Sequence, residues 1–305
     1  MTEPAFPPPP GALSRRRDVA ARFRRHPMAM AGALTLGLIV LGVVLGPLVW
    51  RLDPAGIDLM ARNQGPQPAH PLGTDQLGRD MLARVLAGGR ISLAVGFAAM
   101  ILSLALGTLI GVLAGYVRAL DGPLMRITDV FLALPVLPLL LIAVMLFRAP
   151  LSEALGDGTG IFVLIVAAIA LTSWMPTARI VRGDVLALSA RDFITAARSL
   201  GTSAPRMITR HILPNVASPI LVSASLGIAN AILIESALSF LGLGFPPDFA
   251  SWGRLLSDGM AHLDIAPGRA LWPGAAISLT LLGVNYIGEG LRDAGDPRHR
   301  TRRRR

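Results

Sequence analysis

Residues 28–50 read MAMAGALTLGLIVLGVVLGPLVW, a run of 23 residues without one charged side chain. At a rise of 1.5 Å per residue, a helix of this length is about 35 Å long and crosses a hydrocarbon core of about 30 Å. The run is longer than the apolar part of a signal peptide, and Trp50 and Arg51 do not form a small-residue cleavage site. We therefore expect a retained first membrane span that also acts as a signal anchor.

Five more apolar segments follow and predict an all-α, polytopic membrane protein with six transmembrane helices. They lie at residues 91–117, 124–147, 161–178, 216–240 and 271–287. Gly107, Gly111 and Gly115 are spaced four residues apart in the second span, which lets another helix approach closely. Pro135 and Pro138 lie midway in the third span and predict a kink there.

The composition agrees with a membrane protein. Hydrophobic residues make up 52% of the chain, charged residues only 16%, and the mean hydropathy is +0.57, whereas a soluble domain carries about 25% charged residues. The chain has no cysteine, and all 29 of its basic residues other than histidine are arginine. Because a P-loop needs a lysine, any ATPase that drives this protein is a separate chain.

The distribution of arginine predicts the orientation in the membrane. Of the 29 arginines, 21 lie in the N-terminal segment, the 118–126 loop, the 179–215 loop and the C-terminal segment, which all fall on one side of the six spans. The positive-inside rule then places both termini in the cytoplasm. The net charge of +10 also fits nucleic-acid binding, but no aromatic residues are interleaved with the arginines to stack bases. Membrane topology is the simpler explanation, and no nucleic-acid partner is expected.

These features predict an order of segments along the chain. They are a basic cytoplasmic tail at 1–27, the first span at 28–50, an outer loop at 51–90, a five-helix core at 91–292 containing the cytoplasmic loop 179–215, and an arginine-rich cytoplasmic tail at 293–305. The final run of arginines, 302–305, fits either a solvated end facing lipid or a site for anionic lipid.

No constellation of residues predicts an enzyme or a metal site. The five histidines are far apart and lie outside the expected spans, at His26, His70, His211, His262 and His299. Neither an HExxH motif nor a G-x-S-x-G elbow occurs. The glycine-rich stretch at 156–160 joins two spans, and its composition indicates a turn.

The cytoplasmic loop 179–215 contains the pattern of a short helix. Phe193, Ala197 and Leu200 share one face at spacings of four and seven residues, and Gly201 follows as a natural C-cap. Two interpretations remain open: this helix inserts into a groove of a partner protein, or it lies flat on the lipid headgroups.

A second short helix is expected directly after it. Pro205 suits the first turn of a helix, and Pro214 is expected to end that helix.

This loop resembles the EAA motif of ABC importer permeases, in which E-A-A is followed by a glycine and then by L-P. The motif falls here on Thr195-Ala196-Ala197, Gly201 and Leu213-Pro214. Two positions depart from it, because Thr195 replaces the usual glutamate and His211 replaces the usual apolar residue. The ending His-Ile-Leu-Pro-Asn resembles the peptide and nickel branch of the family.

Other strings resemble the same permeases, in the same order. They are HPLGTDQLGRD at 70–80, RISL at 90–93, LMR at 124–126 with Asp129 and Pro135, ESALSFLGLG at 235–244, and NYIGEGLRD at 285–293. Together they resemble the C-type permease subunit of dipeptide, oligopeptide and nickel ABC importers.

The resemblance implies a type I ABC importer permease fold in a bacterial inner membrane. It implies a heterodimer with a second permease, two ATPase subunits that carry ATP and Mg²⁺, an extracytoplasmic solute-binding protein, and no cofactor on this chain. The helix around 196–201 would then be the coupling helix that docks on an ATPase. The substrate stays open among peptides, a nickel chelate, glutathione and other small solutes.

Polar residues in or near the spans are candidates for the pathway or for helix pairing. Glu235 has two possible roles. It contacts the cargo, or it has a structural role, either pairing with an arginine such as Arg90 or capping a helix in the turn that follows. We expect Asp129 to pair with Arg126. Asn230 and Asn285 either line the pathway or bridge helices.

A different class of protein, an ion-coupled secondary transporter, predicts several buried carboxylates and an inverted repeat. Only Glu235 is a candidate for such a carboxylate, because Asp129 lies at the cytoplasmic end of its span, and no clear repeat is present. A membrane-embedded enzyme would need a catalytic pair, and a structural scaffold would not explain the ordered strings.

Overall fold

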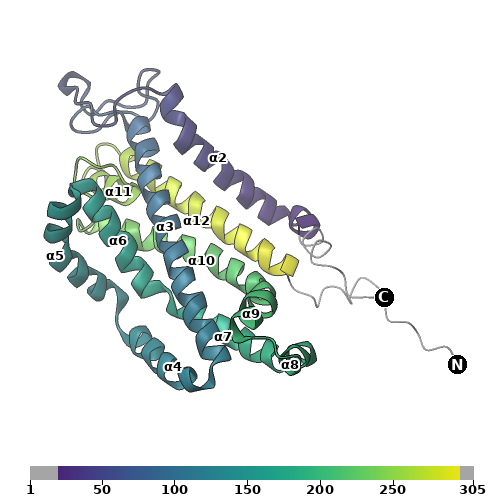
Figure 1. Ribbon diagram of the computed structural model, residues 1–305. Helices are drawn as coiled ribbons and strands as arrows, with labels where there is room; N and C mark the ends of the chain where they lie inside the picture. Colours follow the sequence, from purple (N-terminus) through teal and green to yellow (C-terminus); the bar gives the residue numbers. More distant parts are fainter. Residues whose placement is uncertain (1–19, 296–305) are drawn as a thin grey trace.

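The computed structural model describes residues 20–295, which form an elongated bundle of helices (Figure 1). The expected tails at 1–19 and 296–305, including Arg302 to Arg305, lie outside the described residues. The helices are α2 (Pro27–Val49), α3 (Met81–Tyr116), α4 (Arg118–Ala133), α5 (Val136–Leu155), α6 (Asp157–Ser173), α7 (Met175–Ser189), α8 (Asp192–Ser199), α9 (Ala204–Met207), α10 (Leu213–Phe240), α11 (Trp252–Met260) and α12 (Gly268–Gly295).

Six membrane crossings can be drawn from these helices by length and composition. Five single helices qualify within residues 20–295: α2, α3, α5, the continuous helix Ala204–Phe240, and α12. The pair α6 and α7, which bends by 43°, gives the sixth when it is counted as one broken span. The bend falls at Trp174, two residues before Pro176 in the first turn of α7, where proline removes a backbone donor. The fold is thus the all-α membrane architecture expected from the sequence.

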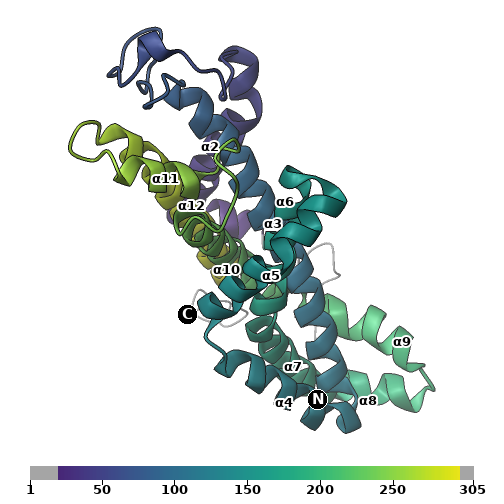
Figure 2. The ribbon, with the colours of Figure 1, turned by 90° about the vertical axis from the view of Figure 1, so that its left-hand side faces the viewer.

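The third crossing differs from the prediction of one kinked span at 124–147. The chain instead breaks between α4 and α5, and only α5 has membrane length. Leu134 adopts an extended conformation with ψ 134° because the ring of Pro135 disfavours the helical conformation of the residue before it. α4 carries four charged residues. It packs against α7, at the end of the bundle where α8 also lies (Figure 2).

The glycine stripe on α3 allows the close helix contact that the sequence predicted. A Cβ added at Gly107 would lie 2.6 Å from the Trp174 carbonyl oxygen, and one at Gly111 would lie 2.6 Å from the Ala178 carbonyl oxygen. A Cβ at Gly115 would lie 2.7 Å from Cβ of Val185. Because real Cβ atoms do not approach so closely, only glycine permits α3 and α7 to pack at this distance.

The two ends of the bundle are different. At one end, the segment 51–80 and α11 pack over the first turns of α3; we call this the α11 end (Figure 1). At the other end lie α4, α8 and α9; we call this the α8 end (Figure 2). Between them, large apolar side chains on α2, α5 and α10 are exposed in the single chain, so these faces are available to lipid or to another subunit.

Candidate coupling site

α8 is anchored to the bundle through one side chain that the sequence analysis missed. Ile194 is fully buried and packs in a cluster with residues of α3, α7 and α10. The other buried members are Val112, Val181, Val185, Met207, Ile212 and Val216. Ala197, one turn on, packs against the same cluster. The spacing of three residues between Ile194 and Ala197 was the available signal for a buried face. Periodicity alone could not show which face of the helix meets the core.

The predicted apolar face of α8 is divided in the structure. Ala197 faces the core, whereas the side chains of Phe193 and Leu200 are 46% and 86% exposed. Thr195 and Ala196 are also exposed. An anchored helix therefore presents two large apolar side chains away from its own chain, which suits either the groove of a partner protein or the lipid headgroups.

Gly201 ends α8 in the way that the sequence predicted. It has a left-handed φ of 76°. Its N–H donates to the Arg198 carbonyl at 3.0 Å, and the Thr202 N–H donates to the Ala197 carbonyl at 3.2 Å. These two bonds form a Schellman cap, which satisfies the last carbonyls of a helix and fixes the direction of the chain that leaves it.

The segment after α8 corrects the expectation that Pro214 ends a short helix. Pro205 does lie in the first turn of α9, but the chain then passes through a π-helical turn, Ile208–Ile212, directly into α10. Pro214 lies in the first turn of α10, where a missing N–H does little harm. The Leu213 N–H bonds to the Ile208 carbonyl, five residues back, so the wider turn keeps the helix continuous across the proline.

The remaining motif residues, His211 and Leu213, belong to this continuous helix. Leu213 packs against the cluster that holds Ile194, and His211 is half-buried. The carbonyl of His211 accepts a hydrogen bond from the side-chain amide of Asn215 at 2.7 Å. A short turn, residues 200–203, therefore separates α8 from the membrane-length helix Ala204–Phe240.

α4 is held to α7 by two ion pairs. Arg179 Nη2 lies 2.5 Å from Asp129 Oδ1, and Arg182 donates two hydrogen bonds to Asp121 at 2.5 and 2.8 Å. The bonds from Arg182 lower the pKa of Asp121. The prediction that Asp129 pairs with Arg126 is wrong, because packing of α4 against α7 brings Arg179 to Asp129 instead.

Comparison with known proteins agrees with this geometry. Residues 107–301 match the family described as binding-protein-dependent transport system inner membrane component. Residues 14–66 match the N-terminal TM domain of oligopeptide transport permease C. The chain belongs to this permease family.

Three named relatives align with nearly the whole of this chain. The oligopeptide transport system permease protein OppC of Bacillus subtilis is 38% identical over 95% of this chain and 92% of its own length. A putative peptide transport system permease protein of Brucella abortus is 42% identical over 92% and 90%. The dipeptide transport system permease protein DppC of Alkalihalophilus pseudofirmus is 38% identical over 98% and 96%.

The protein is thus the permease subunit of an ABC importer, a multi-pass protein of the inner membrane. A permease of this class works with separate ATPases, another permease and a binding protein. The family match spans α4 to α12 and contains the whole of the α8 region.

The candidate pathway residues differ in exposure. Asn230 is exposed on α10, on the same face as Leu226 and Leu233, whose side chains are also exposed. Asn285 on α12 is half-buried. Of the two, Asn230 is the residue that another subunit or a solute could reach in this conformation.

Glu235 is completely buried and joins three elements of the permease. Its carboxylate accepts hydrogen bonds from the hydroxyls of Ser92 on α3, at 2.9 Å, and Ser239 on α10, at 2.7 Å. Ser92 Oγ in turn accepts the N–H of Trp252, the first residue of α11, at 3.2 Å. The alternative in which Glu235 pairs with Arg90 is wrong, because the Arg90 side chain donates to the carbonyls of Val43 and Val44.

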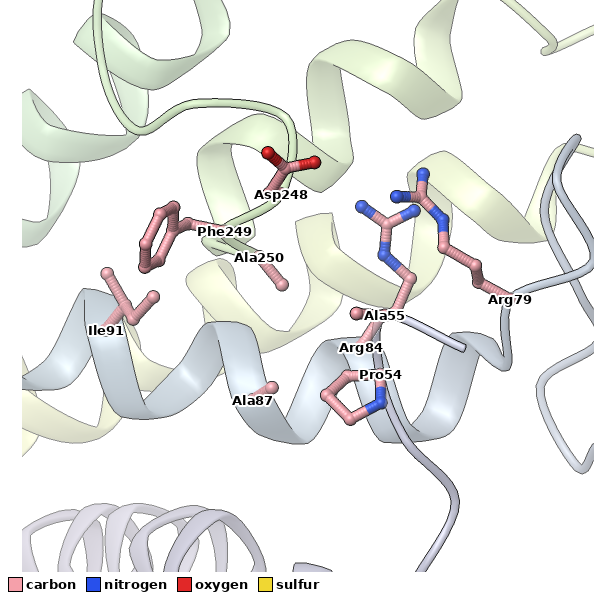
Figure 3. Close-up of a pocket in the computed structure, with 9 residues that line it drawn as sticks. All are labelled: Pro54, Ala55, Arg79, Arg84, Ala87, Ile91, Asp248, Phe249 and Ala250. Carbon is pink, nitrogen blue, oxygen red and sulfur yellow. The ribbon is translucent and has the colours of Figure 1, made fainter. Parts of the chain in front are cut away.

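A buried charge network at the α11 end was also missed by the sequence analysis. Asp75 accepts a hydrogen bond from Arg79 Nε at 2.7 Å and another from Arg84. Both Asp75 and Arg84 are only 2% exposed. Figure 3 shows the guanidinium groups of Arg79 and Arg84 side by side at a cavity of about 170 Å³, which Asp248 lines from the loop before α11. The network fixes the segment 51–80 onto α3.

Replacing Asp75 with asparagine is expected to destabilise the α11 end. The substitution leaves Arg79 without a carboxylate partner and Arg84 with only the more distant Asp258, at 3.9 Å, and removing one partner of a buried ion pair costs about 3–5 kcal/mol. The thermal midpoint of the purified permease, followed by tryptophan fluorescence, should fall by several degrees. Asp264→Asn is the matched control because Asp264 is exposed, and an equal fall in both variants would contradict the role of Asp75.

The pH dependence gives a second check on the same residue. Burial raises the pKa of Asp75, but hydrogen bonds from the backbone and side chain of Arg79 and the charge of Arg84 outweigh it, so the pKa lies below its ordinary value. A lowered pKa stabilises the fold at neutral pH, and that contribution is lost as the pH falls below about 4. The difference in midpoint between the natural chain and Asp75→Asn should therefore shrink in acid.

Proposed function

We propose that this chain forms half of the translocation pathway of an ATP-driven importer for di- or oligopeptides. The cargo class is supported by the relatives, which are named as oligopeptide, dipeptide and peptide transport permeases. The half-pathway role is supported by the face of α10 that carries Asn230 between exposed leucines. Such a face suits the boundary between two permeases. Asn285 and Asp129 serve helix pairing in this proposal.

The coupling mechanism rests on how α8 is held, which suits a rigid lever. Ile194 anchors α8, Gly201 caps its end, and the membrane-length helix Ala204–Phe240 follows after the short turn 200–203. Phe193 and Leu200 would seat in a cleft of an ATPase. Closure of the ATPase dimer would then move α8 and, with it, α10. Thr195 cannot form the salt bridge that a glutamate at this position would provide, so the contact is mainly apolar.

The proposed assembly contains a second, related permease, two ATPases and an extracytoplasmic binding protein. Both termini lie in the cytoplasm, as the arginine distribution indicates. The chain binds no cofactor of its own, and ATP and Mg²⁺ are bound by the ATPases. The absence of lysine supports this division of labour, because a P-loop cannot be built here.

The absence of cysteine permits a direct test by site-specific cross-linking. Leu200→Cys places one thiol on the exposed surface of α8, and a thiol-to-amine cross-linker is applied to membranes that contain all subunits. We expect a covalent product with an ATPase, and we expect ATPase activity to co-purify with the tagged chain. Uptake of labelled di- and tripeptides, measured with and without the chain, tests the cargo.

Met60→Cys is the matched control, because this side chain is 91% exposed but lies in the segment at the α11 end. It should give no product with an ATPase. Equal products from both positions would contradict the coupling role of α8. A folded chain that purifies without an ATPase would favour an ion-coupled secondary transporter instead.

A further inference from the structure

A second cavity, of about 610 Å³, lies at the α8 end between the last turns of α3, α7 and α8. The residues that matter for its chemistry are Tyr116 on α3, Arg118 at the start of α4, Ser189 on α7 and Arg198 on α8. Arg118 and Arg198 are both exposed, so a ligand can reach the cavity from outside. The cavity is far from Glu235 and from the network around Asp75.

The lining of this cavity is strongly cationic. It contains two guanidinium groups and no carboxylate. Of the acids on the surrounding helices, Asp121 binds Arg182 and Asp129 binds Arg179, while Asp184 on α7 and Asp192 on α8 are not among the residues that line the cavity. Within residues 20–295, neither Arg118 nor Arg198 has a carboxylate oxygen within 4 Å. Two positive charges that converge on one cavity without a counter-charge favour an anionic ligand.

Two further observations point to a ligand. The hydroxyl oxygen of Ser189 is buried and has no hydrogen-bond partner, and such an orphaned group calls for an explanation. The guanidinium of Arg198 lies 6.0 Å from the centre of the Tyr116 ring, a contact that holds the charge over the cavity wall.

We propose that this cavity binds a phosphate group, with Arg118 and Arg198 as its cationic ligands and Ser189 as a hydroxyl donor. The planar fork of arginine matches two phosphate oxygens at once. Tyr116 is the last residue of the 36-residue helix α3, which is long enough to cross a membrane, so the cavity lies at or beyond the end of that crossing, where both lipid headgroups and soluble anions can reach it. The phosphate therefore belongs either to an anionic phospholipid or to a soluble phosphate compound.

A bound phosphate would add a direct link between α8 and the junction of α3 and α4, beside the packing of Ile194 and the contact of Arg198 with Tyr116. Arg198 belongs to α8, whereas Arg118 belongs to the junction of α3 and α4. Bridging them restrains α8 relative to the membrane helices. The binding site itself does not depend on the coupling role proposed above, so failure of one leaves the other standing.

The test measures phosphate binding to the intact transporter. In one arm, the complex is placed in nanodiscs of neutral phosphatidylcholine with increasing phosphatidylglycerol, and retained lipid is counted by native mass spectrometry. In the other arm, the complex in neutral detergent is titrated with inorganic phosphate and its thermal midpoint is followed. The variant is Arg118→Gln with Arg198→Gln, and Ser189→Ala is a milder second variant.

The control is Arg206→Gln with Arg210→Gln, which removes the same charge from exposed positions at the α8 end outside the cavity. We expect affinity to fall by about tenfold or more in the cavity variant and much less in the control. Loss in the phosphatidylglycerol arm identifies a lipid, and loss in the inorganic phosphate arm alone identifies a soluble ligand.

Three results would overturn the proposal. The first is no binding in either arm, and the second is equal loss in the cavity variant and the control. The third is unchanged phosphate binding in a cavity variant that no longer retains the ATPases, because the arginines would then contact acidic side chains of a partner.

Discussion

Gly201→Val is expected to abolish most transport while leaving membrane insertion normal. Valine at φ 76° is strained by about 1–3 kcal/mol, because its branched Cβ clashes with the backbone in the left-handed region. The Schellman cap is then lost and the chain leaves α8 in another direction, which moves Leu200 and the start of α9. Because each 1.4 kcal/mol is a factor of ten in population, we expect uptake to fall by about tenfold or more.

Open space around Gly201 makes this test specific. No atom lies within 4 Å of a Cβ built at this position, so the backbone conformation alone carries the effect. The measurement is uptake of labelled peptide, normalised to the amount of permease in the membrane. Gly201→Asn should retain much of the activity, because asparagine tolerates the left-handed conformation.

Gly122→Val is the matched control. Gly122 lies in α4 at the same end of the bundle and also has open space around it, but its φ is not positive. Normal uptake by Gly201→Val would refute the lever mechanism. Equal loss in Gly201→Val and Gly122→Val would show that any bulky residue at this end is harmful.

Glu235→Ala is expected to destabilise the permease and release α11. The substitution removes the acceptor for the hydroxyls of Ser92 and Ser239 in a fully buried place. Unsatisfied buried groups cost about 1–3 kcal/mol each, and the cavity left behind adds to this, giving about 3–5 kcal/mol in total. Because Ser92 also holds the N–H of Trp252, the first turn of α11 loses its fixed position.

Trypsin cleavage reports on α11 directly, since the chain contains no lysine and Arg254 is the only arginine of α11. Faster cleavage at Arg254 and a lower thermal midpoint are expected for Glu235→Ala. Glu235→Gln keeps an acceptor oxygen and should lose much less stability. Glu289→Ala, at an exposed position on α12, should change neither quantity, and unchanged cleavage in Glu235→Ala would show that α11 is held by other contacts.

Local features of the α8 region were predictable because they depend on neighbours in the sequence. Gly201 ends a helix since only glycine readily takes the required φ, and Gly107, Gly111 and Gly115 lie on one face by spacing alone. The prediction that Pro214 ends a helix was wrong for a related reason. The sequence shows that a helical hydrogen bond is missing there, but it does not show that a π-helical turn before the proline absorbs the defect.

Contacts between distant segments were not predictable in this way. Asp129 pairs with Arg179, 50 residues away, and not with Arg126 on its own helix. Ile194 is buried only because α3, α7 and α10 meet around it. Ion pairs follow from which helices pack together, and many packings satisfy the same pattern of apolar residues.

The sequence by itself determined that this chain crosses a membrane several times as helices. An uncharged run of 23 residues has no other stable form in hydrocarbon, where every backbone group must be hydrogen-bonded within its own segment. Only the tertiary structure determined the hydrogen-bond partners of Glu235. Its partner Ser92 is 143 residues away, and the two meet because packing of α3, α10 and α11 leaves one buried place where a carboxylate, two hydroxyls and a helix N-terminus satisfy one another.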